Sequence, residues 1–297
     1  MFTRLCLTLS FALITGAASA QATATASPPP ASGPAPIADY WRPPAFSGPQ
    51  MSPNGRYMAV GAAVAGRTNL MVIDLEKRTV TGLTKYNDFD VIDYEWVGND
   101  YLIYSLGQRN APTGQGKFEA GGLFSIKRDG REGRMISQTV KALRNSGQYV
   151  YRGLEFLDTV DGSDSEFIAA GRERTADGLD LYKYDLKTHR KLLLTPNRPE
   201  RVQEYILDRQ QIARIAVSNV KDTDIVVVYY RETEAAPWRE LYRYASTAGP
   251  VNMPMYFDDD NETLIFASSE GRDTVAIYRY DPRTKTRGEL LASHPRY

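Results

Sequence analysis

Few residues in this sequence could form a hydrolytic centre. Its 297 residues include two histidines, His189 and His294, and a single cysteine, Cys6. A serine nucleophile needs a base such as histidine, held by a third group inside a packed pocket. His189 lies in the charged turn 186–190 and His294 lies close to the C-terminus, so neither has that setting. Their spacing also does not fit a zinc motif.

Serine motifs are present, but a turn or a strand end explains each of them better. The nucleophile elbow G-x-S-x-G does not occur. Ser163 follows Gly162 in a polar loop that has no second glycine at the required place. Ser218 and Lys221 match S-x-x-K, yet the companion S-D-N and K-T-G motifs are absent. We therefore predict no catalytic residue in this chain.

An acidic run and a glycine pair raise the question of a metal or a cofactor. The run 258–262 offers oxygens of the kind that calcium prefers, but the EF-hand pattern is missing. We interpret it as a hairpin turn. Gly114 and Gly116 lack the third glycine and the following helix of a phosphate-binding loop. We predict no metal and no cofactor. The glycine-rich segment 107–122 is the longest loop and a candidate functional loop.

The elements that would position any site are strands, and one kind of strand recurs. Five similar segments begin at residues 70, 123, 181, 241 and 277, with spacings of 53, 58, 60 and 36 residues: LMVIDL, LFSIKR, LYKYDL, LYRYAS and IYRYDP. Repeats of this length indicate small sheets that cannot bury their apolar faces alone. Each unit reads as strand, turn, strand, Leu-Tyr strand, charged turn and closing strand. No convincing amphipathic helix is seen, and only 201–214 is ambiguous.

This pattern predicts an all-β fold, a β-propeller of about five four-stranded blades. We place the blades at roughly 51–84, 91–137, 150–195, 202–245 and 251–292, within a domain over 37–297 that starts with an arm at 37–49. A sandwich or barrel is the alternative, and the repeated strand order favours the propeller. Five blades leave two possibilities open, a ring closed at low blade number or an incomplete ring with an exposed edge.

The N-terminus has the features of a secretory signal. Residues 1–20 contain Arg4, a short apolar run and a final Ala-Ser-Ala. The apolar run is too short to span a bilayer, with an uncleaved anchor as the alternative. The Ala-, Thr- and Pro-rich segment 21–36 reads as a disordered linker. Export, to the periplasm or the extracellular space, and a mature chain without cysteine are therefore expected.

Charge excludes one class of partner. Lys plus Arg and Asp plus Glu both number 36, and the charges are interspersed along the chain. Such a balance gives no electrostatic basis for binding nucleic acid, and no polybasic membrane patch is visible. We expect no nucleic-acid partner and no membrane association after signal cleavage.

The order of several phrases resembles the prolyl oligopeptidase family of serine peptidases, in its secreted bacterial branch. The likeness covers about 37–297 and is carried by 51–59, 69–75, 94–102, 121–130, Tyr205 to Asp208 with Arg214, 238–241 and 289–295. In that family an N-terminal propeller precedes an α/β-hydrolase domain, which carries the serine, aspartate and histidine. No position here matches those residues, so the resemblance implies a truncated, propeller-only chain.

The resemblance implies a propeller that gates or binds peptide substrate and has no catalytic triad of its own. Whether the chain acts as an enzyme stays open, since the family is a serine-type peptidase. The alternative is a free-standing periplasmic propeller that binds a protein or a peptide through loops at one face. Expected partners are a peptide substrate or a protein, with a separate α/β-hydrolase domain as a further candidate. A different enzyme that uses the channel has no coherent set of residues to support it.

Overall fold

The computed structural model describes residues 36–37, 44–108, 119–148, 152–247 and 250–296. The chain divides into two units, Met1–Pro43 and Pro44–Tyr297, and the sheets belong to the second unit. The predicted signal, almost all of the predicted linker and part of the loop 107–122 lie outside the described residues.

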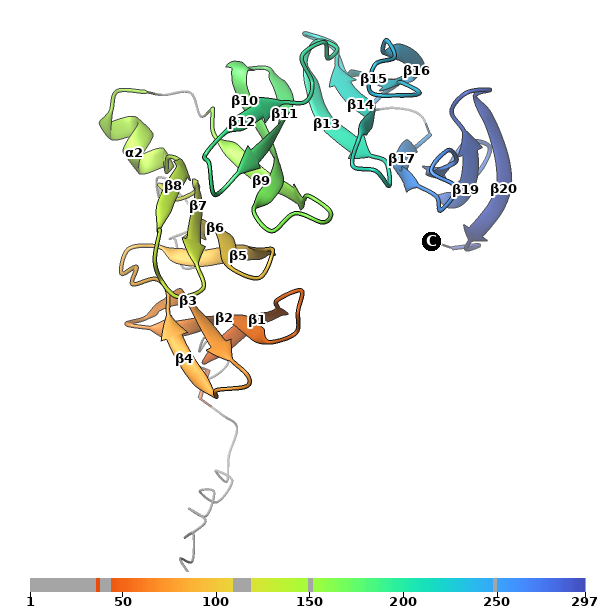
Figure 1. Ribbon diagram of the computed structural model, residues 1–297. Helices are drawn as coiled ribbons and strands as arrows, with labels where there is room; N and C mark the ends of the chain where they lie inside the picture. Colours follow the sequence, from red (N-terminus) through yellow and green to blue (C-terminus); the bar gives the residue numbers. More distant parts are fainter. Residues whose placement is uncertain (1–35, 38–43, 109–118, 149–151, 248–249, 297) are drawn as a thin grey trace, which may run out of the picture. The chain divides into compact units, whose positions relative to one another are not determined.

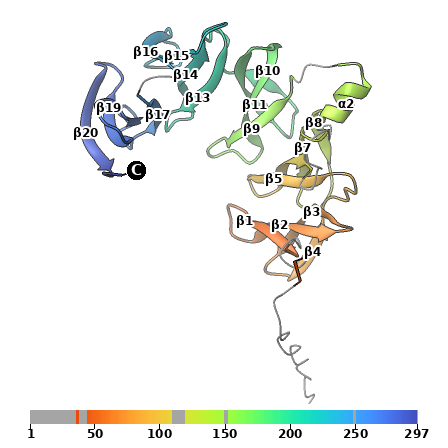
Figure 2. The ribbon, with the colours of Figure 1, turned by 180° about the vertical axis from the view of Figure 1, so that it is seen from behind.

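In the described residues, twenty strands form five four-stranded antiparallel sheets, and the strands of each sheet are neighbours in the order of the chain. The predicted β-propeller architecture is thereby confirmed. The strands of each sheet can be followed by colour in Figure 1 and from behind in Figure 2. Sheet 1 contains β1 (Phe46–Met51), β2 (Tyr57–Val64), β3 (Arg67–Asp74) and β4 (Thr79–Gly82). Sheet 2 contains β5 (Asp90–Val97), β6 (Tyr101–Gly107), β7 (Leu123–Lys127) and β8 (Arg134–Ser137).

The remaining three sheets repeat this arrangement. Sheet 3 contains β9 (Leu154–Thr159), β10 (Glu166–Thr175), β11 (Gly178–Asp185) and β12 (Lys191–Leu193). Sheet 4 contains β13 (Val202–Leu207), β14 (Ala213–Asn219), β15 (Ile225–Tyr230) and β16 (Arg239–Ala245). Sheet 5 contains β17 (Asn252–Phe257), β18 (Leu264–Ser268), β19 (Ala276–Asp281) and β20 (Thr286–Ser293).

Apolar side chains hold each sheet against the next one along the chain. Because successive side chains of a strand point to opposite faces, a middle strand can pack on both neighbouring sheets. The described residues form four apolar clusters of this kind. The cluster between sheets 1 and 2 has fifteen buried residues, including Leu70, Trp96 and Leu102. The cluster between sheets 3 and 4 has only six, including Leu181 and Tyr205. Among the four clusters, the one between sheets 3 and 4 therefore has the fewest buried apolar residues.

The structure corrects the predicted N-terminal arm. The sequence predicts an arm over 37–49, but Phe46–Met51 forms β1, which pairs with β2 in sheet 1. Its two-residue periodicity is concealed by Gly48, whose φ is +57°, and by a register shift between Ser47 and Gln50. The first sheet therefore starts before the predicted boundary at residue 51.

Two further expectations change. A short helix, α2 (Val140–Asn145), follows β8, although no helix was predicted. Thr139 caps it by accepting a hydrogen bond from Ala142 N, and no residue of the helix is buried, so an apolar stripe could not reveal it.

The recurrent Leu-Tyr strand is the third strand in four sheets, but in sheet 4 it is the closing strand β16. The ambiguous stretch 201–214 forms strand and turn. Among the described helical residues, none belongs to a helix able to cross a membrane.

Candidate functional site

Strand β5 carries the first wall of a cavity in sheet 2. Tyr94 and Trp96 face sheet 1, where the Tyr94 hydroxyl donates to Ser47 O at 2.9 Å and accepts from Gly61 N at 2.9 Å. Asp93 and Glu95 occupy the alternate positions of the strand and are exposed. This alternation turns Asp93 to the side of β5 away from sheet 1, while the Glu95 carboxylate accepts a hydrogen bond from Gln50 Nε2 of β1 at 3.1 Å.

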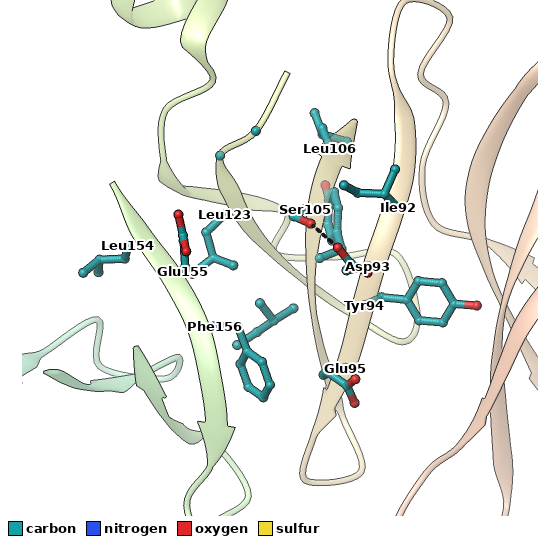
Figure 3. Close-up of a pocket in the computed structure, with 14 residues that line it drawn as sticks. Ile92, Asp93, Tyr94, Glu95, Ser105, Leu106, Leu123, Leu154, Glu155 and Phe156 are labelled. Atoms are coloured by element: carbon teal, nitrogen blue, oxygen red, sulfur yellow. Dashed lines mark hydrogen bonds between the residues drawn. The ribbon is translucent and has the colours of Figure 1, made fainter. Parts of the chain in front are cut away.

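The cavity has a volume of about 450 Å³ and is lined by β5, β6, β7 and β9. Its apolar walls come from six residues: Ile92, Ile103, Leu106, Leu123, Leu154 and Phe156. Its acidic groups are Asp93, Glu95 and Glu155. Figure 3 shows Asp93 and Ser105 facing each other, while Tyr94 points to the other side of β5.

The opposite wall depends on the connection between sheets 2 and 3. The Ser137 hydroxyl accepts a hydrogen bond from Leu154 N at 2.6 Å, which fixes the start of β9 beside β8. Gly122 lies at the rim with φ +83°, and a side chain there would meet Ser137 O at 2.8 Å. Only glycine tolerates both conditions. The Glu155 carboxylate is thereby held at the same cavity as Asp93, although sixty-two residues separate them in the sequence.

The arrangement suits binding and does not suit hydrolysis. Ser105 donates weakly to Asp93 at 3.5 Å, and no histidine, lysine or arginine is among the described residues that line the cavity. A serine without a base is not activated. Burial raises the pKa of Tyr104, and its hydroxyl bonds to the Tyr86 hydroxyl at 3.1 Å, so Tyr104 stays a neutral phenol. Carboxylates beside apolar walls can instead receive a cation that has an aliphatic stem.

The residues considered as nucleophiles or bases lie far apart in the fold and have structural contacts. His189 is exposed in the turn between β11 and β12, with φ +58°. His294 follows β20, and its carbonyl oxygen accepts a hydrogen bond from the Thr274 hydroxyl. Ser163 Oγ accepts from Glu166 N at 3.1 Å in a turn, and Ser218 Oγ donates to Glu200 O at 2.8 Å. Within the described part of the chain, none of these side chains lies beside another.

The acidic run 258–262 is the turn of the hairpin between β17 and β18, as predicted. Asp258 N donates to Thr263 O at 2.8 Å and closes the turn. Asp258 pairs with Arg279 at 2.8 Å, and Asp259 pairs with Arg209 at 2.8 Å. Within the described ranges, no group of three or more histidine, cysteine or acidic side chains could hold a metal ion.

Sequence reasoning did not single out Asp93, Glu95 or Glu155. The signal was available in part, because Asp93 and Glu95 stand at alternate positions among the apolar and aromatic residues of β5. Glu155 gives no such signal, since its contribution depends on how β9 lies against sheet 2. The loop 107–122, proposed as a functional loop, contributes Gly121 and Gly122 to the rim, while residues 109–118 lie outside the described residues.

Comparisons with known proteins agree with the fold. No family model and no curated protein matches the sequence. A structure from a study of two prolyl endopeptidases matches 83% of this chain with a TM-score of 0.51 and 12% identity. A putative dipeptidyl aminopeptidase IV from Bacteroides ovatus matches 84% with a TM-score of 0.50 and 10% identity. The Dos1 propeller matches 83% with a TM-score of 0.42 and 12% identity.

The matched structures are all longer than this chain. The matches cover 36% of the prolyl endopeptidase chain, 40% of the aminopeptidase chain and 59% of the Dos1 chain. Identities this low establish similarity of fold alone. The chain therefore has a β-propeller that resembles the propellers of peptidases, and its function must be argued from the cavity.

Proposed function

We propose that this protein binds peptides through the acidic cavity of sheet 2, and that it is the propeller portion of a secreted serine peptidase like the prolyl oligopeptidases. In this proposal it receives or gates peptide substrate and performs no hydrolysis itself. The observation that carries the proposal is the set of Asp93, Glu95 and Glu155 around apolar walls, without a cation among the described lining residues. The likeness of fold to a prolyl endopeptidase supports the peptidase context.

The chemistry of the cavity selects a basic side chain. A lysine or arginine has an apolar stem, which would pack against Ile103, Leu123 and Phe156, and a cationic end for the carboxylates. The volume of about 450 Å³ accommodates one long side chain and part of a neighbouring residue. Bulk steering would contribute little because the chain is neutral overall, so affinity would depend on these local groups.

Calorimetric titration with two blocked tripeptides tests the site. Acetyl-Ala-Lys-Ala-amide should bind at least about tenfold more tightly than the norleucine analogue, since the two differ mainly in charge. The double variant Asp93→Asn, Glu155→Gln should abolish that preference. Glu289→Gln, on the exposed strand β20, is the matched control and should leave it unchanged. Equal affinities of the wild-type protein for both peptides would refute the proposed site.

The peptidase context has its own test. A fluorophosphonate probe should not label the purified chain, and a hydrolase domain supplied separately should be required for cleavage of peptide substrates. Specific labelling of a serine would contradict a propeller without a triad. Partner and export remain part of the proposal, and cell fractionation should place the protein outside the cytoplasm.

A free-standing periplasmic binding module is the second candidate. The four apolar clusters between consecutive sheets favour it, because they give each sheet a packed neighbour without a second domain. A monodisperse chain with one cooperative unfolding transition would support this candidate. An aggregating chain that gains a cooperative transition only with a hydrolase domain would favour the peptidase portion.

A further inference from the structure

Arg231, which follows β15, is a buried cation with incomplete hydrogen bonding. Its residue is 6% exposed. Nε donates to Ala213 O at 2.6 Å and Nη1 donates to Glu234 O at 2.7 Å. The guanidinium lies over Trp238, with Cζ 4.5 Å from the ring centroid. Nη2 has no hydrogen-bond partner among the described residues.

The unpartnered nitrogen keeps access to solvent. In the described part of the chain, the enclosed side-chain nitrogens that lack a partner are Nε of Arg56 and Nε of Arg201. Nη2 of Arg231 is not one of them, so it retains accessible surface although the residue is more than nine-tenths buried. Among the described residues, Arg231 therefore has one donor that is neither hydrogen-bonded nor fully enclosed.

Two other arginines, whose side chains are 8% (Arg198) and 7% (Arg214) exposed, show what Arg231 lacks. Arg198 Nε contacts Asp180 Oδ1 at 2.8 Å, and Arg214 Nη1 lies 3.6 Å from Asp208 Oδ2. Arg231 forms no ion pair within the described residues. Burial lowers the pKa of the Arg231 guanidinium, and the carboxylates of Glu234 and Asp208, which are beyond ion-pair distance, offset only part of this effect.

A buried charge without a close counter-charge is unfavourable, since the protein interior solvates it poorly. Arginine nevertheless keeps its proton. The two carbonyl oxygens and the Trp238 ring supply partial compensation. An anion that accepts from Nη2 would supply the rest, and the gain would be larger than at an exposed arginine because water is displaced.

The space in front of Arg231 is large enough for a ligand. A cavity of about 890 Å³ lies between the loop from β12 to β13 and the loop from β15 to β16. Its walls are largely apolar and aromatic, with contributions from Leu192, Pro196, Tyr229, Pro237 and Trp238. A second cavity of about 340 Å³ shares Leu192, Leu194, Arg231 and Glu234 with the first. Both cavities adjoin the interface between sheets 3 and 4, which has the smallest cluster of buried apolar residues.

We propose that this cavity binds a carboxylate that is attached to an apolar body, with Arg231 Nη2 donating to the carboxylate and Trp238 packing against the body. Arg198 also lines the cavity, but its guanidinium already donates to Asp180, to Pro199 O and to the Thr175 hydroxyl. Glu200 and Glu234 line it too, and their charges disfavour a ligand with several negative charges. A hydrophobic organic acid and the C-terminal residue of a peptide both have the required chemistry.

This site is independent of the acidic cavity, which lies between sheets 2 and 3 and prefers a ligand of the opposite charge. The arrangement around Arg231 also holds the chain together, because Arg231 ties Ala213 to the loop at Glu234. The experiment must therefore separate binding from folding. Pairs of ligands that differ only in charge do so without any change to the protein.

Calorimetric titration of the full chain with 3-phenylpropanoate and with 3-phenylpropanamide tests the proposal. The acid should bind at least about tenfold more tightly than the amide, and inorganic phosphate should bind more weakly than the acid because it has no apolar body. Acetyl-Gly-Phe as free acid and as amide distinguishes the two sources. A larger acid-to-amide ratio for the dipeptide than for 3-phenylpropanoate would indicate a peptide C-terminus, and a smaller ratio would indicate an organic acid.

Variants assign the effect to Arg231. Arg231→Gln should remove the preference for the acid, and Glu234→Gln should strengthen acid binding about two- to threefold by removing a like charge. Arg190→Gln, in an exposed turn, is the matched control and should change nothing. If Arg231→Gln does not fold, the acid-to-amide ratio and Glu234→Gln still decide. Equal binding of acid and amide, phosphate binding as tightly as the acid, or a preference retained in Arg231→Gln would overturn the proposal.

Discussion

The acidic cavity and the arginine cavity occupy similar places in the fold but have opposite chemistry. Each lies where one sheet meets the next, the first between sheets 2 and 3 and the second between sheets 3 and 4. The acidic cavity takes its charges from strands β5 and β9, and these carboxylates are exposed. The positive charge of the arginine cavity comes from Arg231, which is buried and donates a hydrogen bond to Glu234 O in the loop after β15.

This difference teaches where selectivity for a ligand should be strongest. Exposed carboxylates are solvated in the free protein, so a cation that binds them must replace water and gains less than a ligand at a buried charge. Arg231 has already lost most of its water, so an anion restores an interaction that the free protein lacks. We therefore expect the arginine cavity to discriminate charge more sharply than the acidic cavity, and we expect a larger stability cost when its surroundings are disturbed.

The largest effect should follow from removing a counter-charge beside the arginine cavity. Asp180 is fully buried and accepts from Arg174, from Arg198 at 2.8 Å and from Thr195. Asp180→Asn would leave two arginines without their carboxylate and should lower the free energy of unfolding by about 3–5 kcal/mol in urea titrations. Asp177→Asn, which affects an exposed pair with Arg201, should cost below about 1 kcal/mol. Similar costs for both variants would contradict the role assigned to buried ion pairs here.

A smaller effect should separate the apolar clusters behind the two cavities. Leu186 follows β11 and packs in the ten-residue cluster between sheets 2 and 3, whereas Leu181 packs in the six-residue cluster between sheets 3 and 4. Leu186→Ala should lower the free energy of unfolding by about 3–4 kcal/mol and Leu181→Ala by about 2 kcal/mol, because the smaller cluster offers fewer apolar contacts to lose. Thermal unfolding of both variants measures this order. A greater loss for Leu181→Ala would mean that the interface between sheets 3 and 4 is not the weaker one.

A still smaller effect concerns the two tyrosine hydroxyls beside the cavities. The Tyr94 hydroxyl both accepts from Gly61 N and donates to Ser47 O, whereas the Tyr205 hydroxyl donates to Leu179 O at 3.0 Å. Tyr94→Phe leaves a buried N–H without its acceptor and should cost about 1.5–2 kcal/mol. Tyr205→Phe should cost about 0.5–1 kcal/mol. Chemical denaturation gives both values, and the reverse order would contradict this account of the contacts between sheets 1 and 2.

The smallest effect distinguishes carboxylates used within the fold from those available to a ligand. The Thr263 hydroxyl and the N–H groups of Thr263 and Glu262 hold the pKa of Asp260 below its usual value. Its ionised form therefore stabilises the fold above about pH 4, and this contribution is lost as the pH falls through the lowered pKa. Asp260→Asn should cost below about 1 kcal/mol at pH 7, and the difference from wild type should vanish near pH 2. Asp259→Asn, at an almost fully exposed side chain, is the matched control and should cost less than Asp260→Asn at pH 7.

The fold could be predicted in large part because its information is local. Alternating strands such as β11 and turn residues such as Asn54 and Gly55 appear directly in the sequence, and so does the recurrence of the Leu-Tyr strand. The errors also have local causes. Gly48 concealed β1, α2 has no buried residue, and the fourth Leu-Tyr strand closes sheet 4 although it is the third strand elsewhere.

The two cavities could not be predicted in the same way. Asp93 and Glu155 line the same cavity because the Ser137 hydroxyl fixes β9 beside sheet 2. Arg231 looks like any of the other arginines in the sequence, and its distinction is that it is buried while no carboxylate lies within ion-pair distance among the described residues. Such a property belongs to the packing of sheets 3 and 4, which depends on residues far apart in the chain. Sequence reasoning could exclude a triad, but it could not locate a binding site.

One set of titrations tests the central claim that the two cavities prefer ligands of opposite charge. Acetyl-Ala-Lys-Ala-amide and 3-phenylpropanoate are each titrated into wild type, Asp93→Asn with Glu155→Gln, and Arg231→Gln. We predict that the acidic-cavity variant loses at least about tenfold in affinity for the lysine peptide and keeps its affinity for the acid, and that Arg231→Gln shows the reverse. Parallel loss of both ligands in either variant, or retention of both, would contradict the account.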